Sequence, residues 1–581
     1  MSFQTSNPNR ESALKELKGN PRTQVLIIGG GINGAGVFRD LALQGADCLL
    51  VDKSDWCAAT SAAPSRLIHG GLKYLETGEF RLVAESIHER NLLLKNAPHY
   101  VHALASVVPI RSYFGGVLPA IRRFFGGDAN LADRGLLIVE LGMILYDLFG
   151  VRSRMTPLHR IKIGRSVRRA FPRIDSSVVA IATYYDACVS QAERLGFELI
   201  NDGLQAHSGA RAINYLAADG FEGRSVRLVD RRSLALYEIR PDIIINAAGP
   251  WIDHVNHALT LPTSYIGGAK GSHLIIDSPE LVEQLRGQMI YYGGADGRVC
   301  LVYPLFGHAL LGSTDIPFDD PDAVVCAEDE TSYMLSTLRE VFPDIAIKSD
   351  QVIYRYSGVR PLPLALRRTG GQVTRDHSLQ RDNLSGIPTY SMIGGKWTTF
   401  RAFSEETADV VLEAIGRKRV RSTEGEPVGG GRGFPKSDAE QAAWIARFSE
   451  TYGVDIEQAP LWLDRYGSAA DRIAAAAGGR PNHALTSLPH FRDSEIAALA
   501  RQEQVVSLAD LIFRRTPIAI AGQLSISAVE ELGRIVGGAL GWTSDQTNIE
   551  IETTLATARD KFGVRLPRRN AVAPNLTSER A

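Results

Sequence analysis

The feature that most constrains the fold is a glycine-rich turn near the N-terminus. It lies between two short apolar runs, residues 25–28 and residues 48–51, with a helix-like pattern after the turn. Gly29, Gly31 and Gly34 form a G-x-G-x-x-G pattern. In such a pattern the backbone turns sharply, approaches a pyrophosphate and lets a helix pack closely on a strand. The order predicted here is strand, glycine turn, helix, strand.

An acidic residue follows the second apolar run. Asp52 lies where a carboxylate would accept hydrogen bonds from the ribose hydroxyls of an adenosine. The first turn of the predicted helix would offer unpaired N–H groups to the pyrophosphate. Glycine clusters also occur in ordinary turns, but a cluster between two strand patterns, with an acid at this distance, predicts a dinucleotide site.

The following residues indicate which dinucleotide is bound. Residues 59–75 carry small hydroxylated side chains and continue into R-L-I-H-G-G-L-K-Y, where a nicotinamide enzyme would begin another plain βα unit. The run T-S-A-A-P-S-R-L-I-H-G-G-L-K-Y-L-E resembles the signature of the FAD-dependent, respiratory glycerol-3-phosphate dehydrogenase family of the D-amino-acid oxidase superfamily. Later motifs agree in order: N-A-A-G-P-W (246–251), K-G-S-H (270–273), G-S-T-D (312–315), Y-S-G-V-R-P-L (356–362), T-R-D (374–376) and G-G-K-W-T-T (394–399).

The resemblance covers most of residues 22–402, and the far C-terminus resembles the family's helical domain. It implies FAD as the cofactor and a hydride transfer from sn-glycerol 3-phosphate, which becomes dihydroxyacetone phosphate, with the electrons passed to a quinone. An oxidase or a dehydrogenase for another polyol phosphate, such as erythritol phosphate, stays open, as does a flavin-binding scaffold without dehydrogenase activity. The cofactor contacts implied are Gly29, Gly31, Asn33, Gly34, Asp52, Lys53, Thr60, Ser61, Ser65, His69, Gly70, Gly71, Ala248, Gly249, Gly395, Lys396, Trp397 and Thr398.

Substrate binding requires positive charge for a phosphate. The family motifs place Arg360 at the central catalytic position, and His273 is the second catalytic candidate because imidazole titrates where a base is useful. A guanidinium stays protonated at any working pH. Arg360 is therefore expected to orient the C2 hydroxyl and stabilise the developing alkoxide. The substrate contacts implied by the resemblance are Lys73, Tyr74, His273, Thr314, Arg360, Arg375 and Lys396.

Two departures from the family pattern leave the polyol phosphate open. Lys73 stands where the family commonly has arginine, which keeps the charge but loses the bidentate fork. Residues 190–194 replace a segment that usually reads like D-D-A-R-L. Neither departure removes the flavin chemistry, and the retained basic residues argue against a scaffold without activity.

A helix after Gly394 and Gly395 is expected to stabilise the reduced flavin. The strand-like run 389–393 ends in these glycines, so the N-terminal dipole and free amides of a following helix could face the negative charge on the ring. Thr398 and Thr399 are expected to cap that helix. The alternative is a simple glycine turn.

The length of 581 residues exceeds what one hydrophobic core usually serves, so several domains are expected. The predicted fold class is mixed α/β (α+β), with a discontinuous Rossmann-like FAD-binding domain, a substrate domain on an antiparallel sheet and a C-terminal helical domain. The ranges are 22–80, 175–250 and 350–415 for the FAD-binding domain, 81–174 and 251–349 for the substrate or cap domain, 421–438 for a Gly- and Pro-rich linker, and 439–565 for the helical domain.

Residues 111–154 form the least ordinary stretch. An apolar run with Glu140 and Asp147 in it falls short of the roughly 20 apolar residues that span a bilayer. One interpretation is a buried helix. A second is an interfacial element whose apolar side chains enter the bilayer surface while arginines lie at headgroup level. A third is a partner-binding surface. Residues 79–96, just before this stretch, predict a surface helix.

Composition limits partners and compartment. The formal net charge of −1 gives no reason to expect nucleic acid, and the five scattered cysteines favour reduced thiols and no metal site. Residues 1–20 have no apolar segment typical of a secretory signal and are interpreted as a loose polar lead, and the tail after Lys561 as disordered. The expected location is cytoplasmic, with peripheral attachment to the inner face of the cytoplasmic membrane and a homodimer as further alternatives.

Overall fold

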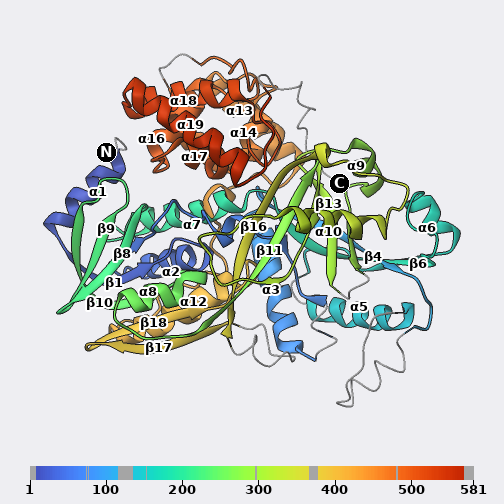
Figure 1. Cartoon of the computed structure of the whole chain (residues 1–581), viewed down its shortest axis with the longest axis horizontal. Helices are drawn as coiled ribbons and strands as arrows, with labels where there is room; N and C mark the ends of the chain where they lie inside the picture. The colour runs from blue at the N-terminus through green and yellow to red at the C-terminus, as the bar shows by residue number, and fades with distance from the viewer. Residues whose placement is uncertain are drawn as a thin grey trace.

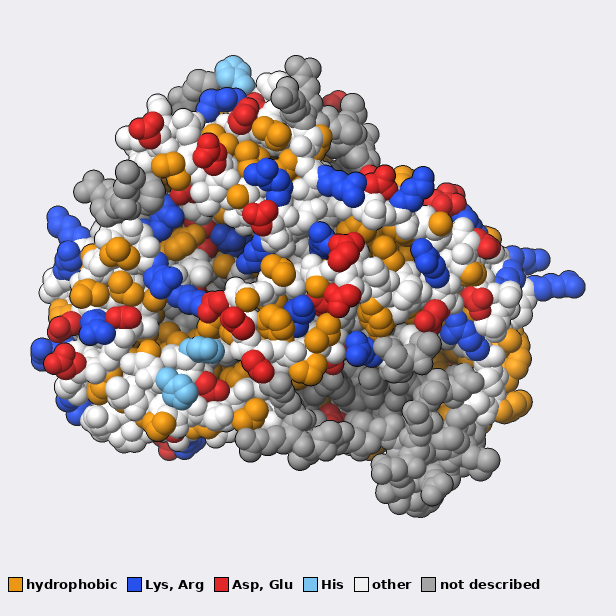
Figure 2. Space-filling model, viewed as in Figure 1, with side chains coloured by type: hydrophobic (Ala, Val, Ile, Leu, Met, Phe, Trp, Pro, Cys, Tyr) orange, Lys and Arg blue, Asp and Glu red, His pale blue; other side chains and the backbone are white. Residues whose placement is uncertain are grey.

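The computed structural model describes residues 8–72, 75, 78–115, 135–151, 154–294, 298–364, 377–478 and 482–567. Two large sheets stand side by side, and a helical domain formed by the C-terminal part of the chain covers one end of both (Figure 1). On the face drawn in Figure 2, acidic and basic side chains are interspersed over the sheets and the helical domain alike.

The first sheet contains the glycine turn. Its strands lie in the order β17, β18, β10, β1, β2, β7, and all neighbours are parallel except the edge pair β17 and β18. The predicted strand, turn, helix and strand are confirmed as β1, α2 and β2. Buried Val, Ile and Leu side chains fill both faces, as expected for parallel strands covered on both sides. The bounds are β1 (Arg22–Ile28), α2 (Ile32–Leu43), β2 (Cys48–Val51), β7 (Arg211–Ile213), β10 (Leu236–Asn246), β17 (Ser378–Leu384) and β18 (Ile387–Ile393).

Helices and a hairpin cover this sheet. Helices α7 (Ala192–Ala206) and α12 (Phe400–Ala414) pack against α2 on one face. The hairpin of β8 (Leu216–Glu222) and β9 (Ser225–Asp230) extends β10 and closes the other face.

The second sheet is antiparallel apart from one parallel pair, β12 and β4. It confirms the predicted antiparallel sheet, while its assignment to a substrate domain stays a prediction. Strands β3, β6 and β16 belong to it, although their residues fall in ranges assigned to the FAD-binding domain, so the domain boundaries stay predictions. The strands are β3 (Leu67–Ile68), β4 (Val101–Ile110), β5 (Arg160–Ile163), β6 (Ala180–Val189), β11 (Ile266–Ile276), β12 (Met289–Gly293), β13 (Val299–Leu305), β14 (His308–Gly312), β15 (Ile316–Pro317) and β16 (Val352–Pro363).

The remaining helices follow the sequence patterns closely. The predicted surface helix is α3 (Phe80–Asn96). The C-terminal helical domain is confirmed, with a π-helical turn, η8, after α17. The helices outside the first sheet include α8 (Ile252–Ala258), α9 (Pro279–Leu285), α10 (Glu328–Arg339), α13 (Asp438–Tyr452), α14 (Ala459–Tyr466), α15 (Ala470–Ala477), α16 (Asp493–Gln502), α17 (Leu508–Asp510), η8 (Leu511–Arg515), α18 (Ile526–Leu540) and α19 (Ser544–Asp560).

The prediction of a loose N-terminal lead is wrong for residues 8–19. They form helix α1 (Pro8–Gly19), whose Leu17 is buried. Arg10 forms a buried ion pair with Asp230 (Nη2 to Oδ1, 2.9 Å). The local sequence gives no sign of this contact, because the partner of Arg10 lies 220 residues away.

The prediction of a disordered tail is also wrong for its first residues. Phe562 stacks on Tyr354 with ring centroids 4.8 Å apart, and its carbonyl accepts a hydrogen bond from the Arg355 amide (3.0 Å). Residues 568–581 lie outside the described residues.

Helix α5 (Leu136–Gly150) occupies the apolar run of the segment 111–154. Val139, Met143 and Tyr146 are buried on its inner side, where the helix contacts α3 and β6. Its outer side is exposed, and Leu141 retains 60% of its accessible surface. The buried-helix interpretation is therefore wrong for this outer side. Residues 116–134 and 152–153 of the segment lie outside the described residues.

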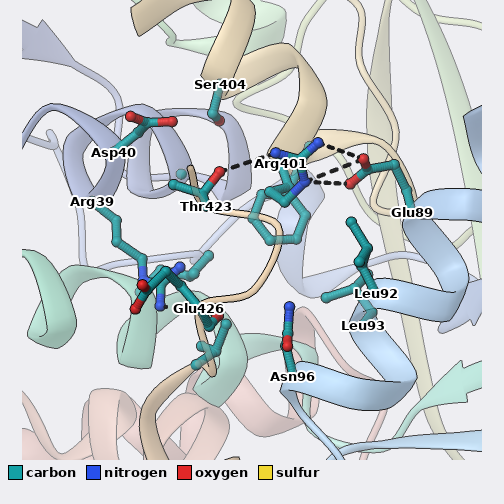
Figure 3. A pocket seen from close by; sticks show the side chains of 14 residues that line it. Arg39, Asp40, Glu89, Leu92, Leu93, Asn96, Arg401, Ser404, Thr423 and Glu426 are labelled. Atoms are coloured by element: carbon teal, nitrogen blue, oxygen red, sulfur yellow. Dashed lines mark hydrogen bonds and ion pairs between the residues drawn. The ribbon is translucent and has the colours of Figure 1, made fainter. Parts of the chain in front are cut away.

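Residues 417–432 connect α12 to the helical domain, and we call this segment the strap. Its residues 421–432 belong to the predicted linker 421–438 and carry no α-helix, but side chains of α12 and α3 hold the strap in place. Arg401 of α12 donates to both carboxylate oxygens of Glu89 on α3 (2.6–3.1 Å) and to Thr423 of the strap (3.0 Å). Figure 3 shows Arg401 between these two partners. The space enclosed here is about 20 Å³, which is room for about one water molecule.

We predict that Glu89→Gln loosens the strap. The loss of a buried, charged acceptor costs about 1–3 kcal/mol, so tryptic cleavage at Arg417 to Arg421 should become at least about fivefold faster. The control is Glu424→Gln, because Glu424 lies on the strap but its partner His88 is exposed. Equal cleavage rates in the two variants would contradict the proposed clamp.

Candidate active site

A cleft of about 340 Å³ lies at the edge of the first sheet where β1, β2, β10 and β18 end. Ligands of open α/β sheets bind at the carboxyl ends of the parallel strands. The turns after these strands form one wall of the cleft, and residues 357–359 of β16 in the second sheet form the opposite wall. The site therefore lies between the two sheets.

The glycine turn leaves no room for side chains. Gly29 has φ +110°, and a Cβ atom there would lie 2.6 Å from the carbonyl oxygen of Ala247 on β10. A Cβ atom on Gly34 would lie 1.8 Å from the carbonyl oxygen of Gly29. Helix α2 begins directly after Gly31, so its positive N-terminal end faces the cleft. This backbone cradle fits the pyrophosphate of a dinucleotide.

Asp52 is positioned by the backbone. Its two carboxylate oxygens accept hydrogen bonds from the amides of Gly30 and Ser54, each at 2.7 Å. Burial raises the pKa of Asp52 to about 6, while these two hydrogen bonds act in the opposite direction. Neighbouring Lys53 pairs with Asp322 (2.7 Å) and lies 4.1 Å from the ring centroid of Trp251. The role of Asp52 on a ribose stays a prediction.

The loop after β2 bridges the two sheets. The hydroxyl of Thr60 donates to the carbonyl oxygen of Val359 on β16 (2.7 Å). The hydroxyl of Ser61 accepts the amide of Ile32 at the start of α2 (2.9 Å), and its carbonyl oxygen accepts from the indole of Trp397 (3.2 Å). Three separate segments thus meet around one small, polar turn.

Arg360 extends from β16, the strand that forms the far wall, but its own side chain does not line the cleft. Its guanidinium donates to a carboxylate oxygen of Asp315 (3.0 Å) and, at 3.4–3.5 Å, to the carbonyl oxygen of Thr314. It lies over Gly271 of β11, where a Cβ atom would be 2.3 Å from Nη2. The strand pairing thus leaves a space that the planar guanidinium fills.

The structure argues against His273 as a general base. The imidazole is buried and stacks on Tyr356 at 5.0 Å, and it does not line the cleft. Burial, with Arg360 and Arg66 nearby, lowers the pKa of His273 to about 3. A general base works best when its pKa lies near the operating pH, so an imidazole with so low a pKa would bind the substrate proton too weakly.

The hydroxyl of Thr314 is engaged within the protein, and its contact with a substrate stays a prediction. This hydroxyl accepts the amide of Ser272 (2.9 Å) and donates to Glu330 (2.8 Å), which forms a buried ion pair with Lys270 (2.7 Å). The single hydroxyl proton is thus used within the protein. Among the other predicted substrate contacts, Lys396 lines the cleft, and Lys73, Tyr74 and Arg375 lie outside the described residues.

The glycine pair after β18 forms a turn before the helix begins. Gly394 and Gly395 have φ +76° and +92°, and α12 starts only at Phe400. The predicted caps are wrong: the side chain of Thr399 makes no capping hydrogen bond, and the hydroxyl of Thr398 accepts the amide of His69 (3.1 Å). The turn instead packs on α2, where Asn33 donates to the carbonyl oxygen of Gly394 (3.1 Å).

Comparison with known proteins identifies the family. A model described as FAD dependent oxidoreductase matches residues 24–384, which is more than half of the chain. The chain belongs to this family. A second model, described as the C-terminal domain of alpha-glycerophosphate oxidase, matches residues 421–547. These matches confirm the resemblance found in the sequence, and they give FAD as the cofactor.

Individual relatives agree over nearly the full length. A glycerol-3-phosphate dehydrogenase of Synechocystis sp. is 31% identical over 92% of this chain and 96% of its own length. A D-erythritol 1-phosphate dehydrogenase of Brucella abortus is 28% identical over 85% of this chain and 93% of its own. The solved structure of glycerol-3-phosphate dehydrogenase from Bacillus halodurans, complexed with FAD, has the same fold, with a TM-score of 0.73, 22% identity, and coverage of 96% of this chain and 99% of that one.

Most of the predicted cofactor residues come together in the cleft of this FAD-dependent oxidoreductase. Six do not line it, and some of these make contacts within the protein instead. Gly34 packs on Gly29, and the Gly70 amide donates to Tyr146 and Asp186. Those lining the cleft are Gly29, Gly31, Asn33, Asp52, Lys53, Thr60, Ser61, Ala248, Gly249, Gly395, Lys396 and Trp397; those outside it are Gly34, Ser65, His69, Gly70, Gly71 and Thr398.

Sequence reasoning missed the contribution of the C-terminal domain. No motif in the domain is typical of a nucleotide site, and its residues lie more than 400 positions from the glycine turn. The cleft is nevertheless lined by Phe513, Arg514, Ile520, Lys561 and Phe562.

We predict that Gly34→Ala yields protein without stable FAD. The added methyl group would collide with backbone, not with a flexible side chain, so the glycine turn must move. The control is Gly538→Ala in α18, because a Cβ atom there meets nothing within 4 Å. The ratio of flavin to protein absorbance after gel filtration measures the effect. A full flavin content in Gly34→Ala would contradict the packing argument.

Proposed function

We propose that this protein oxidises sn-glycerol 3-phosphate to dihydroxyacetone phosphate. The observation that carries the proposal is Arg360, a fixed guanidinium on the strand whose residues 357–359 form a wall of the FAD cleft. The similarity to named glycerol-3-phosphate dehydrogenases over almost the whole chain supports it. Bound FAD would supply the hydride acceptor.

The charges of the site suit an alcohol that becomes a ketone. Arg360 presents a planar fork that can orient the C2 hydroxyl and stabilise negative charge as its proton leaves. Lys396 adds a second cation beside the glycine turn that follows β18. Since burial keeps His273 neutral, Arg360 and Lys396 carry the positive charge among the described candidates.

A second polyol phosphate is the nearest alternative. The Brucella relative is named for D-erythritol 1-phosphate, and Lys73 replaces the arginine common in the family. Anaerobic bleaching of the flavin absorbance distinguishes the substrates. Reduction by glycerol 3-phosphate at the lowest concentration supports the proposal, and a clear preference for erythritol phosphate contradicts it.

We also propose that the outer side of α5 attaches the enzyme to a membrane surface, where a quinone accepts the electrons. The exposed residues Leu137, Leu141, Ile144 and Leu148 recur at helical spacing along one stripe. An apolar stripe of this kind suits insertion into the headgroup boundary. No helix among the described residues is both long and apolar enough to cross a bilayer, so surface attachment is the form we propose.

The two acidic residues of α5 do not oppose such attachment. His159 lies between them, with Nδ1 2.6 Å from Asp147 and Nε2 3.4 Å from Glu140. Burial opposes protonation of this imidazole, but the hydrogen bonds to both carboxylates outweigh it and raise the pKa of His159. A protonated His159 would neutralise part of the acidic charge at the surface.

We predict that Arg360→Lys slows flavin reduction by glycerol 3-phosphate about 10²–10³-fold, because lysine keeps the charge but not the fork. Flavin content and spectrum should stay normal. Stopped-flow reduction is the measurement. Arg355→Lys on the same strand is the control, since Arg355 pairs with Glu328 away from the cleft. A rate for Arg360→Lys within a few-fold of wild type would disprove the role.

We predict that replacing both Leu141 and Leu148 by Ser reduces co-sedimentation with anionic liposomes, while activity with a soluble dye stays unchanged. The control pair is Leu234→Ser with Leu236→Ser, because these leucines are equally exposed elsewhere. Equal sedimentation of both double variants would argue against the surface. Loss of a dimer without any liposome binding would assign the stripe to a second copy of the chain.

A further inference from the structure

The loop after β2 has one side in the FAD cleft and the other in the protein. Asp52, Lys53 and Ser54 line the cleft. Asp55 and Trp56, next along the chain, are buried on the other side. The position of the first three residues therefore depends on what holds the last two.

Asp55 is held by the C-terminal domain. Arg515 forms a fork on its carboxylate, with Nη1 2.7 Å from Oδ2 and Nη2 2.8 Å from Oδ1. Arg514 adds a third bond through Nε at 2.5 Å, and Asn214 donates to Oδ1 at 3.0 Å. Burial disfavours the charged form, but the two arginines outweigh it and hold the pKa of Asp55 well below its ordinary range.

Trp56 connects the same domain to the glycine turn. Its indole Nε1 donates to the side-chain oxygen of Gln504 (2.8 Å), in the segment between α16 and α17. The indole ring lies directly against Gly30, where a Cβ atom would be 2.3 Å from Cε3. A shift of Trp56 would therefore displace Gly30 in the glycine turn, which is the predicted site of the pyrophosphate.

One π-helical turn, η8, both binds Asp55 and forms part of the cleft wall. In η8, Phe513 and Arg514 line the cleft while Arg515 is buried on Asp55. Arg514 also pairs with Asp510 of α17 (2.6 Å), so the turn is fixed to its own domain. Any movement of this domain would displace a cleft wall and the support of the loop together.

We propose that the C-terminal helical domain contributes to FAD binding. Through Arg515 and Asp55 it positions the loop 52–58, so docking of the domain and binding of FAD stabilise each other. Coupling between two such events is reciprocal, because each must change the free energy of the other by the same amount. Arg515 is a positioning residue in this scheme, because it reaches the cofactor through Asp55 and the loop.

The first test compares Arg515→Lys with Arg194→Lys. Both arginines are fully buried and both fork onto a carboxylate across the same domain junction. Arg194, however, binds Glu503 (2.8 and 2.9 Å), and it contacts Arg515 only at the backbone carbonyl oxygen (2.8 Å), not at Asp55 or its loop. Release of FAD from the holoenzyme is followed by the rise in free-flavin fluorescence after dilution. Arg515→Lys should raise the dissociation constant for FAD at least about tenfold, and Arg194→Lys less than about threefold.

A dissociation constant for Arg515→Lys within threefold of wild type would overturn the proposal. An equal rise in both variants would overturn it as well, because a general weakening of the junction would then explain the result. The dissociation constant is measured without any substrate turnover.

The second test uses wild-type protein, in case Arg515→Lys does not fold. Amide hydrogen exchange is measured at low and at saturating FAD. Reciprocal coupling requires slower exchange in residues 508–515 when FAD is bound, with no comparable change in α13, which does not line the cleft. Equal exchange in residues 508–515 at both FAD concentrations would overturn the proposal.

Discussion

The close approach of β1, β10 and the start of α2 is the constraint on which the site depends. Gly29 and Gly34 let three backbone segments meet where any side chain would collide with a carbonyl group. This contact sets the edge at which four parallel strands end, and so it determines where a cofactor can lie. The second sheet then only has to present β16 to the same edge. The glycine turn and the strand that carries Arg360 thus belong to different sheets but line one cleft.

Buried ion pairs between distant segments hold this arrangement together. Arg39 with Asp202, Arg194 with Glu503, and Arg515 with Asp55 each have both side chains almost completely buried. Such pairs add little net stability, because desolvation offsets most of the attraction, whereas breaking one leaves an uncompensated charge. We infer that these pairs act mainly by disfavouring alternative packings of the junctions. This explains why the strap and the C-terminal domain are fixed although their local sequences read as loose or generic.

The sequence predicted well what is encoded locally. The apolar runs around the glycine turn gave β1, α2 and β2, and helical spacing gave α3 and the helices of the C-terminal domain. It failed where a partner is distant. Arg10 meets Asp230, so a polar lead became a helix, and Thr398 meets the amide of His69, so it caps nothing. The environment of His273 could not be predicted, because its burial depends on Tyr356, across a strand pairing that spans 83 residues.

The C-terminal domain and α5 lie on opposite sides of the molecule, which separates cofactor support from the proposed membrane attachment. Figure 1 shows the C-terminal domain at the top of the molecule and α5 near the bottom, with the sheets between them. An acceptor that arrives at α5 from a membrane would therefore approach from the side away from the C-terminal domain. Phe513 and Phe562 of the C-terminal domain line the cleft. We therefore expect them to support the bound cofactor, and not to bind the electron acceptor. Since Asp55 and Trp56 link that domain to the loop of Asp52, its effect on the cofactor passes through this loop.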